Sequence, residues 1–339
     1  MAAALGVLVS CGSVKSGEEV VAASRDSKVV VAYVTSWSEV MPDPQYMTHI
    51  NYAFGHVNES FNGVTIDNEE RLRQIVDLRK QKPELKVLLS IGGWGSGRFS
   101  EMAANDEYRR AFAADCDRVV KEFALDGIDI DWEYPTSSMA NISSSPDDTE
   151  NFTLLMQDIR AAIGNEKELT LATVASARYI DFKAILPSVD FVNIMAYDMA
   201  SAPKHHSALY PSGHSGDITS DGAVTAHLKA GVTPSKLVMR MPFYGRGGDG
   251  YPSFQDYNKV GNTDTQYTEK WDEVAQVPYL ADKNDTLVFG FENPRSLAIK
   301  CQYILDKDLL GGMYWDYSGD NEQGDLRRTV AENLLGKPH

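Results

Sequence analysis

Eight short apolar runs, spread along almost the whole chain, constrain its fold more than any other feature. The runs alternate with amphipathic stretches and cover residues 29–34, 50–54, 86–91, 127–132, 169–175, 191–196, 237–242 and 312–315. Eight strands that alternate with helices in a chain of 339 residues most economically close into a (β/α)8 TIM barrel. A doubly wound open sheet is the alternative, but no glycine-rich phosphate fingerprint follows an early strand. We therefore expect an α/β barrel.

Two of the stretches between the runs have clear helical periodicity. Residues 148–163 place apolar side chains at i, i+3, i+4 and i+7, and Ser145 and Pro146 before them predict an N-cap and a first-turn proline. Residues 294–305 show the same spacing, with Asn293 as the expected cap. Residues 247–287 have no regular pattern, and they predict a small, reduced insertion between the seventh and eighth strands.

Three acidic side chains occupy alternate positions at the end of the fourth run, in the segment DGIDIDWEYP at 126–135. Side chains at every second position of a strand share one face, so Asp129, Asp131 and Glu133 would project together. Neighbouring like charges disfavour one another's ionisation, and the arrangement therefore favours a carboxyl group that keeps its proton near neutral pH. A general acid needs such a proton.

A solvated acidic face or a divalent-metal site would also account for a run of acids. Ile128, Ile130 and Trp132 alternate with the acids and require a buried opposite face, which argues against a solvated loop. The seven histidines show no H-E-x-x-H spacing, and no EF-hand-like loop is present. Acid–base chemistry is the preferred interpretation, and neither a metal nor a cofactor is expected.

The segment at 126–135 resembles the signature of glycoside hydrolase family 18, the chitinases. Five other segments resemble motifs of that family in the expected order: NYAF at 51–54, SIGGW at 90–94, MAYD at 195–198, MPFYGR at 241–246 and GGMYWD at 311–316. Together they span roughly residues 29–335. The resemblance implies a TIM barrel that hydrolyses chitin or N-acetylglucosamine oligomers with help from the substrate, an exception to the two-carboxylate scheme.

The resemblance also implies roles for four catalytic residues. Glu133 would protonate the glycosidic oxygen, and the substrate's 2-acetamido oxygen would attack the sugar, so that configuration is retained. Asp131 would orient the acetamido N–H, and Asp129 behind it would share a proton with Asp131. Tyr197 would hydrogen-bond the acetamido oxygen.

Sugar-binding and supporting roles follow from the same motifs. Asp198 would hold the sugar or the acid, Trp315 would lie beneath the distorted ring, and Tyr33 would hydrogen-bond Asp129. Further candidates for sugar binding are Phe54, Trp94, Tyr134, Met195, Tyr244 and Arg246. The alternative is that these residues only pack against one another at the top of the barrel. Ser90, Gly92, Gly93 and Asp126 are expected to support the site, with Asp126 at the start of its strand. Trp37 would stack on a distal sugar or sit in a loop, and His205 and His206 are expected to be solvated.

A retaining, endo-acting chitinase is the leading functional prediction. The alternatives are an endo-β-N-acetylglucosaminidase that acts on N-glycan cores and a non-catalytic sugar-binding relative. Processive members of the family carry a larger insertion between the seventh and eighth strands. The shorter stretch here predicts an open groove and non-processive cleavage.

The formal charge of 32 − 48 = −16 argues against nucleic acid as a partner. We expect the protein to be a monomer.

The first residues predict export. Residues 1–10 are apolar and precede Cys11, a pattern that resembles a bacterial lipoprotein signal with its lipidated cysteine. Residues 1–27 would then be an anchor and tether, and residues 28–339 the catalytic barrel. The expected location is the bacterial outer membrane, periplasm or cell surface, or otherwise the medium. Cys116 and Cys301 lie on helical apolar stripes and are expected to be buried and unpaired.

Overall fold

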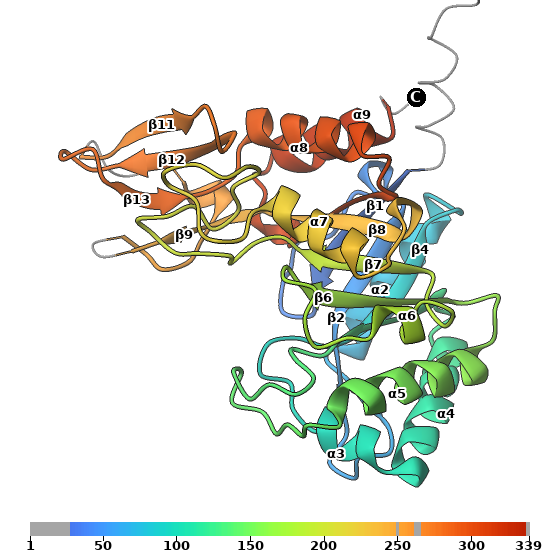
Figure 1. Cartoon of the computed structure of the whole chain (residues 1–339). Coiled ribbons are helices and arrows are strands. Elements are labelled where there is room, and N and C mark those ends of the chain that lie inside the picture. Colours follow the sequence, from blue (N-terminus) through green and yellow to red (C-terminus); the bar gives the residue numbers. More distant parts are fainter. Residues whose placement is uncertain (1–27, 249–250, 261–265, 337–339) are drawn as a thin grey trace, which may run out of the picture.

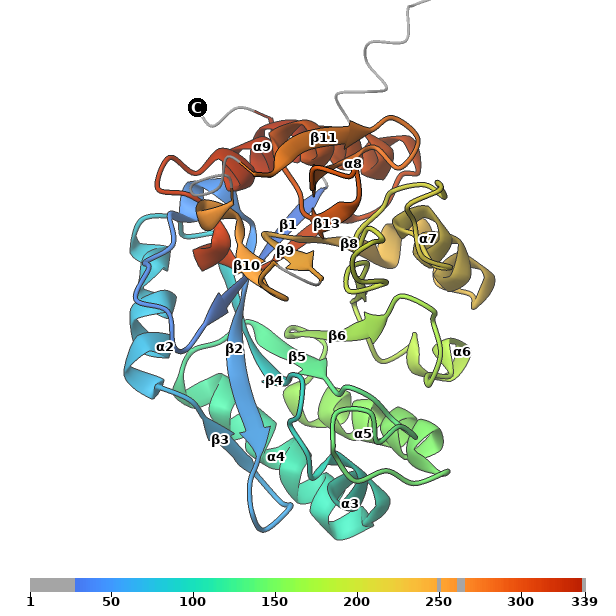
Figure 2. The same ribbon diagram turned by 90° about the vertical axis from the view of Figure 1, so that its left-hand side faces the viewer.

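Eight parallel strands form a closed barrel at the centre of the structure (Figure 1, Figure 2). The computed structural model describes residues 28–248, 251–260 and 266–336. The barrel order is β1-β14-β8-β7-β6-β5-β4-β2, and pairing of β1 with β2 closes it. Its strands are β1 (Val29–Thr35), β2 (His49–Val57), β4 (Lys86–Gly92), β5 (Gly127–Asp131), β6 (Glu168–Val174), β7 (Phe191–Met195), β8 (Leu237–Pro242) and β14 (Gly311–Trp315). The predicted TIM barrel and all eight of its strands are confirmed.

Helices surround the barrel, and Figure 2 looks into the ring that they form. They are α2 (Glu69–Val76), α3 (Phe99–Ala104), α4 (Asp106–Glu122), α5 (Asp148–Ile163), α6 (Phe182–Ile185), α7 (Ser220–Lys229), α8 (Pro294–Asp306) and α9 (Asp325–Leu334). A short strand, β3 (Val64–Ile66), pairs antiparallel with β2. Within the described part, no helix is long and apolar enough to cross a membrane.

The main apolar core lies between the outer face of the barrel and the helices. Trp132, which follows β5, is 2% exposed and stacks on Phe99 of α3 with ring centroids 5.3 Å apart. Its ring also meets Phe152 of α5 edge-on at 5.6 Å. The apolar side of the acidic segment is therefore buried against helices, as its alternation predicted, and the acids face the interior of the barrel.

Helix α8 begins as the sequence predicted, whereas the start of α5 differs from the prediction. Asn293 caps α8 in a reciprocal capping box with Ser296, as expected. Helix α5 has the predicted bounds, but its N-cap is Asp147, so the predicted cap and first-turn proline at Ser145 and Pro146 were wrong. The Ser145 N–H instead donates to the buried Asp148 carboxylate at 2.7 Å, and this contact holds the residues before the helix in a turn.

The stretch predicted as irregular, between β8 and β14, folds into a five-stranded antiparallel sheet of order β10-β9-β13-β12-β11. Its strands are β9 (Tyr244–Gly247), β10 (Gln255–Asp256), β11 (Thr268–Asp272), β12 (Val277–Ala281) and β13 (Leu287–Gly290). Figure 1 shows β11, β12 and β13 projecting from one end of the barrel. The insertion is small, as expected, but it is regular in structure. We call it the insertion sheet.

The cysteines on helices are placed as expected. Cys116 lies on α4 and Cys301 on α8, and both are buried and free. Cys11, the predicted lipidation site, lies outside the described residues, as do the rest of residues 1–27.

Candidate active site

The innermost acid, Asp129 of β5, is fully buried and receives four hydrogen bonds. The Tyr33 hydroxyl donates at 2.6 Å and the Ser90 hydroxyl at 2.8 Å, both to Oδ2. The Thr170 hydroxyl donates at 2.6 Å and the Asn193 side-chain amide at 3.3 Å, both to Oδ1. The donors come from β1, β4, β6 and β7, so the Asp129 side chain lies inside the barrel and side chains from four other strands hold it in place.

Asp131 lies at the carboxyl end of β5, where TIM barrels carry their active sites. It is 1% exposed, and its Oδ1 has no hydrogen-bond partner within the described part of the chain. Burial is the main reason that the pKa of Asp131 is raised well above its ordinary value, and the charges of Glu133 and Asp129 raise it further. The positive charge of Arg240 opposes this shift. Asp131 therefore binds a proton more readily than an ordinary aspartate.

Glu133 follows two residues beyond the end of β5, rather than ending the strand as the sequence suggested. Burial raises the pKa of Glu133, and the negative charge of Asp198 adds to the effect. Arg240 and a hydrogen bond with the Tyr134 side chain act in the opposite direction, but the pKa stays above its ordinary value. A half-buried glutamate with a raised pKa is suited to donate a proton to a substrate in the cleft.

Sequence reasoning missed Arg240, a buried cation in the middle of β8. The side chain is 2% exposed, and its guanidinium carbon lies 4.4 Å from the ring centroid of Tyr33, 4.7 Å from that of Tyr197 and 5.1 Å from that of Trp315. The sequence carried one signal, because Arg240 is the only charged residue in the apolar run 237–242. A charge inside a buried strand needs a compensating partner, and here the partners are aromatic rings and the acids of β5.

The acids face a cleft of about 710 Å³ at this end of the barrel. Trp315, at the end of β14, stacks on Phe54 with ring centroids 5.6 Å apart and a tilt of 22°. Large side chains at the rim are strongly exposed, namely Trp37, Trp94, Met139 and Phe254. The other predicted binding residues that line the cleft are Tyr134, Met195, Tyr197, Asp198, Tyr244 and Arg246. An aromatic cleft of this size can hold sugar rings by their apolar faces.

Asp198 and Arg246 join the barrel to the insertion sheet. Arg246 of β9 donates from Nε to Asp198 Oδ1 at 2.7 Å and from Nη2 to Oδ2 at 2.6 Å. Burial raises the pKa of Asp198, but Arg246 and the neighbouring His206 outweigh that effect and hold it well below its ordinary value. Asp198 is therefore an ionised carboxylate at the edge of the cleft, held by a two-pronged contact.

The expectation that His205 and His206 are solvated was wrong. Both are buried, at 2% and 1% exposed, because their loop packs beneath the insertion sheet. The His205 ring meets Tyr279 of β12 edge-on at 5.5 Å, and the His206 ring lies 5.3 Å from that of Tyr244. His206 Nδ1 is 3.4 Å from Asp198 Oδ1. The histidines support the wall of the cleft from behind.

Gly92 and Gly93 allow the end of β4 to lie close to the Asp131 backbone and to the Phe54 ring. Their φ angles are +132° and +92°, values that side-chain-bearing residues rarely adopt. A Cβ on Gly92 would lie 2.0 Å from the Asp131 carbonyl oxygen, and one on Gly93 would lie 2.6 Å from the ring of Phe54. The Gly93 N–H donates to the same carbonyl at 2.9 Å. The two glycines therefore set the position of Asp131.

Asp126 lies at the opposite end of β5, away from the cleft. Its Oδ2 accepts a hydrogen bond from the Val87 N–H of β4 at 2.7 Å and pairs with Arg79. Asp126 contacts the neighbouring strand and takes no part in the cleft.

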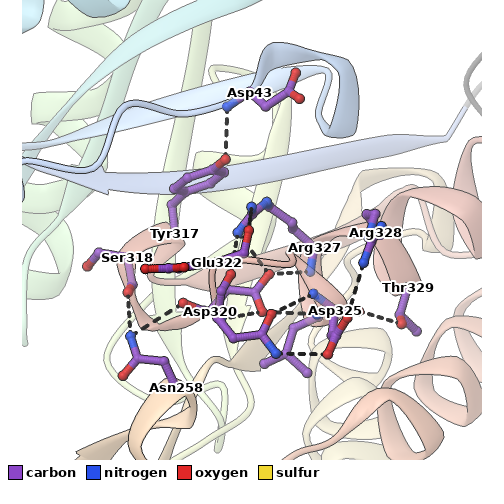
Figure 3. A network of polar contacts seen from close by, with 12 residues as sticks. Asp43, Asn258, Tyr317, Ser318, Asp320, Glu322, Asp325, Arg327, Arg328 and Thr329 are labelled. Atoms are coloured by element: carbon purple, nitrogen blue, oxygen red, sulfur yellow. Dashed lines mark hydrogen bonds and ion pairs between the residues drawn. The ribbon is translucent and has the colours of Figure 1, made fainter.

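A polar network fixes the chain that follows Trp315, and Figure 3 shows it. The Asp43 N–H donates to the Tyr317 hydroxyl at 2.8 Å, which ties this segment to the loop after β1. The Asn258 amide of the insertion donates to the Ser318 carbonyl at 3.2 Å. The segment after Trp315 is thus anchored both to the loop after β1 and to the insertion.

Within the described residues, no group of three or more His, Cys, Asp or Glu side chains is arranged to hold a metal ion.

Comparison with known proteins adds independent evidence. The family described as Glycosyl hydrolases family 18 matches residues 29–320. Chitinase A1 of Niallia circulans is 29% identical over 424 residues, with 93% of this chain and 60% of the relative covered. Chitotriosidase-1 of Mus musculus is 30% identical, with 90% and 78% covered. The chain thus spans less than two thirds of the length of Chitinase A1.

Solved structures give the same picture. A glycoside hydrolase family 18 N-acetylglucosaminidase from Paenibacillus barengoltzii superposes with a TM-score of 0.83 at 32% identity, covering 91% of this chain and all of that one. Chitinase ChiA74 from Bacillus thuringiensis superposes with a TM-score of 0.84 at 26% identity, covering 92% of this chain and 70% of that one.

Proposed function

This chain belongs to glycoside hydrolase family 18, and from that premise we propose that it is a retaining, endo-acting chitinase. Its substrates would be chitin and β-1,4-linked oligomers of N-acetylglucosamine. The observation that carries the proposal is the row of alternate acids Asp129, Asp131 and Glu133. Asp131 and Glu133 face an aromatic cleft, and the pKa of each is raised. No cofactor is needed for this chemistry.

In the proposed first step, Glu133 donates its proton to the glycosidic oxygen as the bond from that oxygen to C1 breaks. The carboxylate groups that line the cleft in the described residues are Asp131, Glu133 and Asp198. The Asp198 carboxylate is paired with Arg246, and Asp131 is more deeply buried than Glu133. Neither carboxylate is therefore well placed to attack the sugar. The substrate's acetamido oxygen would therefore attack C1 and form an oxazolinium ion.

In the second step, water would attack C1 and give a proton to the Glu133 carboxylate while the bond from C1 to the acetamido oxygen breaks. This restores the acetamido group and the protonated acid, and the configuration is retained. Asp131, whose Oδ1 has no hydrogen-bond partner among the described residues, would accept a hydrogen bond from the acetamido N–H and stabilise the positive charge of the intermediate. Asp129 would share a proton with Asp131 from behind. Tyr197 would donate to the acetamido oxygen, and Trp315 would support the apolar face of the distorted ring.

Hydrolysis of a panel of N-acetylated and deacetylated oligomers tests the reaction. We expect cleavage of acetylated chains only, with the β-anomer formed first when the products are followed by proton NMR. Equal rates on deacetylated chains would contradict attack by the acetamido group. An inverted anomer would contradict it as well.

An endo-β-N-acetylglucosaminidase that acts on N-glycan cores is the second candidate. The similarity to the family 18 N-acetylglucosaminidase from Paenibacillus barengoltzii supports an N-acetylglucosaminidase as an alternative to a chitinase. Comparing rates on chitooligosaccharides with rates on a high-mannose glycoprotein separates the two candidates. A non-catalytic sugar-binding protein is less consistent with the presence of Glu133, and measurable hydrolysis of either substrate would exclude it.

The size of the insertion sheet supports non-processive cleavage, because a low wall leaves the groove open for chains to dissociate. Product analysis on long chitin should then show intermediate oligomers from the earliest times. Disaccharide released in long runs without intermediates would contradict this.

We also propose that the protein is exported, with lipidation at Cys11 tethering it to a membrane, and that it is a monomer. The support for export is the apolar stretch before Cys11 and the small, polar residues after it. Mass spectrometry of the mature N-terminus in the native host is the test, and an unmodified Met1 would contradict it. Size-exclusion chromatography with light scattering tests the monomer.

A further inference from the structure

The guanidinium of Arg240 is a charged group in the cleft whose burial the proposed reaction leaves unexplained. Within the described residues, Nε and Nη1 have no hydrogen-bond partner, although the side chain is 2% exposed. A guanidinium cannot release its proton in a protein, so it stays charged. Burial of an unpaired charge is strongly unfavourable, which means that something near Arg240 must compensate for it.

Three aromatic rings supply part of the compensation. The guanidinium carbon lies 4.4 Å from the Tyr33 ring, 4.7 Å from the Tyr197 ring and 5.1 Å from the Trp315 ring, all within cation–π range. Each of these residues belongs to the proposed site: Tyr33 donates to Asp129, Tyr197 would bind the acetamido group, and Trp315 would support the sugar. Arg240 also lines the cleft itself.

The acids of β5 supply the rest. Four groups face Arg240: Asp131 at the end of β5, Glu133 two residues beyond it, Tyr33 of β1 and Tyr197 two residues beyond the end of β7. Arg240 interacts electrostatically with all four. Asp129 lies behind Asp131, while Asp198 at the rim is ionised and paired with Arg246 of the insertion sheet. Arg240 is thus the buried positive charge among the carboxyl groups of the barrel interior.

We propose that Arg240 is a positioning residue of the acid pair: a fixed positive charge at the floor of the cleft that sets the pH range in which Asp131 and Glu133 together hold the proton needed for catalysis. It acts through the acids and need not touch the substrate. The inference rests on the proposed hydrolase function, because the acid pair must work by proton transfer for the charge to matter.

The sign of the effect follows from electrostatics. A positive charge favours the ionised form of a nearby carboxyl group, so Arg240 lowers the pKa of Asp131 and of Glu133. Its removal should raise both values. The pH profile of kcat/KM reports the free enzyme's essential acid and base, so both limbs should move to higher pH, by about one pH unit or more for a charge buried in the same cleft.

The test compares Arg240→Met, Arg240→Lys and the wild type in pH profiles of kcat and kcat/KM on N-acetylated oligomers. Methionine removes the charge but keeps an unbranched side chain beneath the rings, and we expect its profile to move upward. Lysine restores the charge, and we expect it to bring the profile back toward that of the wild type. Arg79→Met is the matched control, because Arg79 pairs with Asp126 at the opposite end of β5. It should leave the limbs in place.

A side chain that merely packs against three rings would change stability and rate without moving the limbs. A folded Arg240→Met enzyme with an unmoved profile would therefore overturn the inference, as would a profile that moves to lower pH. If Arg240→Met does not fold, Arg240→Gln takes its place as the neutral variant, and displaced limbs in Arg240→Lys would also contradict the inference. A wild type without activity on the oligomers would refute the proposed function instead.

Discussion

At the residue scale, the site depends on one carboxyl group that keeps its proton inside a cleft. Glu133→Gln keeps the size of the side chain but removes the transferable proton. We expect kcat to fall by about 10²-fold to 10⁴-fold, with the fold and much of the affinity for N-acetylated oligomers preserved. Steady-state kinetics and calorimetric binding measure the two effects. Glu166→Gln, at an exposed glutamate, is the control and should leave kcat unchanged.

Gly92 makes a second residue-scale prediction, because its backbone supports Asp131 directly. A Cβ there would meet the Asp131 carbonyl at 2.0 Å with φ at +132°, so Gly92→Ala must move one of the two strands. We expect a loss of about 1–3 kcal/mol in the free energy of unfolding, together with reduced kcat, measured by urea denaturation and kinetics. At Gly213, no heavy atom of the described residues beyond its chain neighbours lies within 4 Å of an added Cβ, so Gly213→Ala should change neither. Wild-type kcat in Gly92→Ala would show that Asp131 tolerates displacement.

The sequence predicted the acids at this scale but only some of their partners. Alternation with Ile and Trp placed Asp129, Asp131 and Glu133 on one face, since a strand has a fixed period of two. Thr170 and Asn193 were missed, because a hydrogen bond across 41 or 64 residues depends on which strands become neighbours across the barrel. Arg240 was missed for the same reason, since its partners lie on β1, β5 and β14 and in the segment that follows β7.

At the scale of elements, a buried ion pair fastens α8 to the end of the insertion. Lys300 of α8 donates to the Ser207 carbonyl at 2.5 Å and pairs with Glu292, and both charged side chains are almost fully buried. Lys300→Met would leave the Glu292 charge buried without its partner, so we expect a loss of about 3–5 kcal/mol in the free energy of unfolding. Urea denaturation measures it.

Two further variants make this prediction specific. Adding Glu292→Leu to Lys300→Met removes the orphaned charge and should recover part of the loss. Lys80→Met breaks an exposed pair with Asp77 and should change the free energy of unfolding by less than about 0.5 kcal/mol. If all three variants were equally stable, the buried pair would have no role in holding the elements together.

The elements themselves were predictable where they are long and buried on both faces. The eight barrel strands appear as continuous apolar runs because helices cover their outer side and side chains fill their inner side. The insertion sheet escaped prediction because its strands are short, and because β9 pairs with the distant β13 as well as with β10, its neighbour along the chain. Its ladder is irregular as well, with a register shift between Leu280 and Ala281. Such a sheet leaves little period-two signal in the sequence.

At the scale of the whole molecule, the buried acids should reduce the stability of the fold in a pH-dependent way. A carboxyl group whose pKa is raised by folding does not lower the free energy of unfolding below its unfolded pKa of about 4, because it is protonated in both the folded and the unfolded chain. The cost grows as pH rises above that value, since the unfolded chain releases a proton that the folded enzyme retains, and it levels off once the folded-state pKa is passed. Asp131 is a group of this kind.

Asp131→Asn should therefore inactivate the enzyme and yet stabilise it at neutral and alkaline pH. We expect its Tm to exceed that of the wild type at pH 8 and the two values to converge toward pH 4, as measured by calorimetry across the pH range.

Glu168→Gln should change the stability with pH in the opposite direction. Burial raises the pKa of Glu168, but hydrogen bonds with His49 and Lys86 outweigh that and lower it, so its stabilisation is present above about pH 4 and is lost as pH falls. This variant should be less stable than the wild type at pH 8 and approach it in acid. A Tm difference for Asp131→Asn that does not change with pH would mean that Asp131 ionises as easily in the folded enzyme as in the unfolded chain. That would contradict its burial with no partner for Oδ1 in the part of the chain that the structure describes.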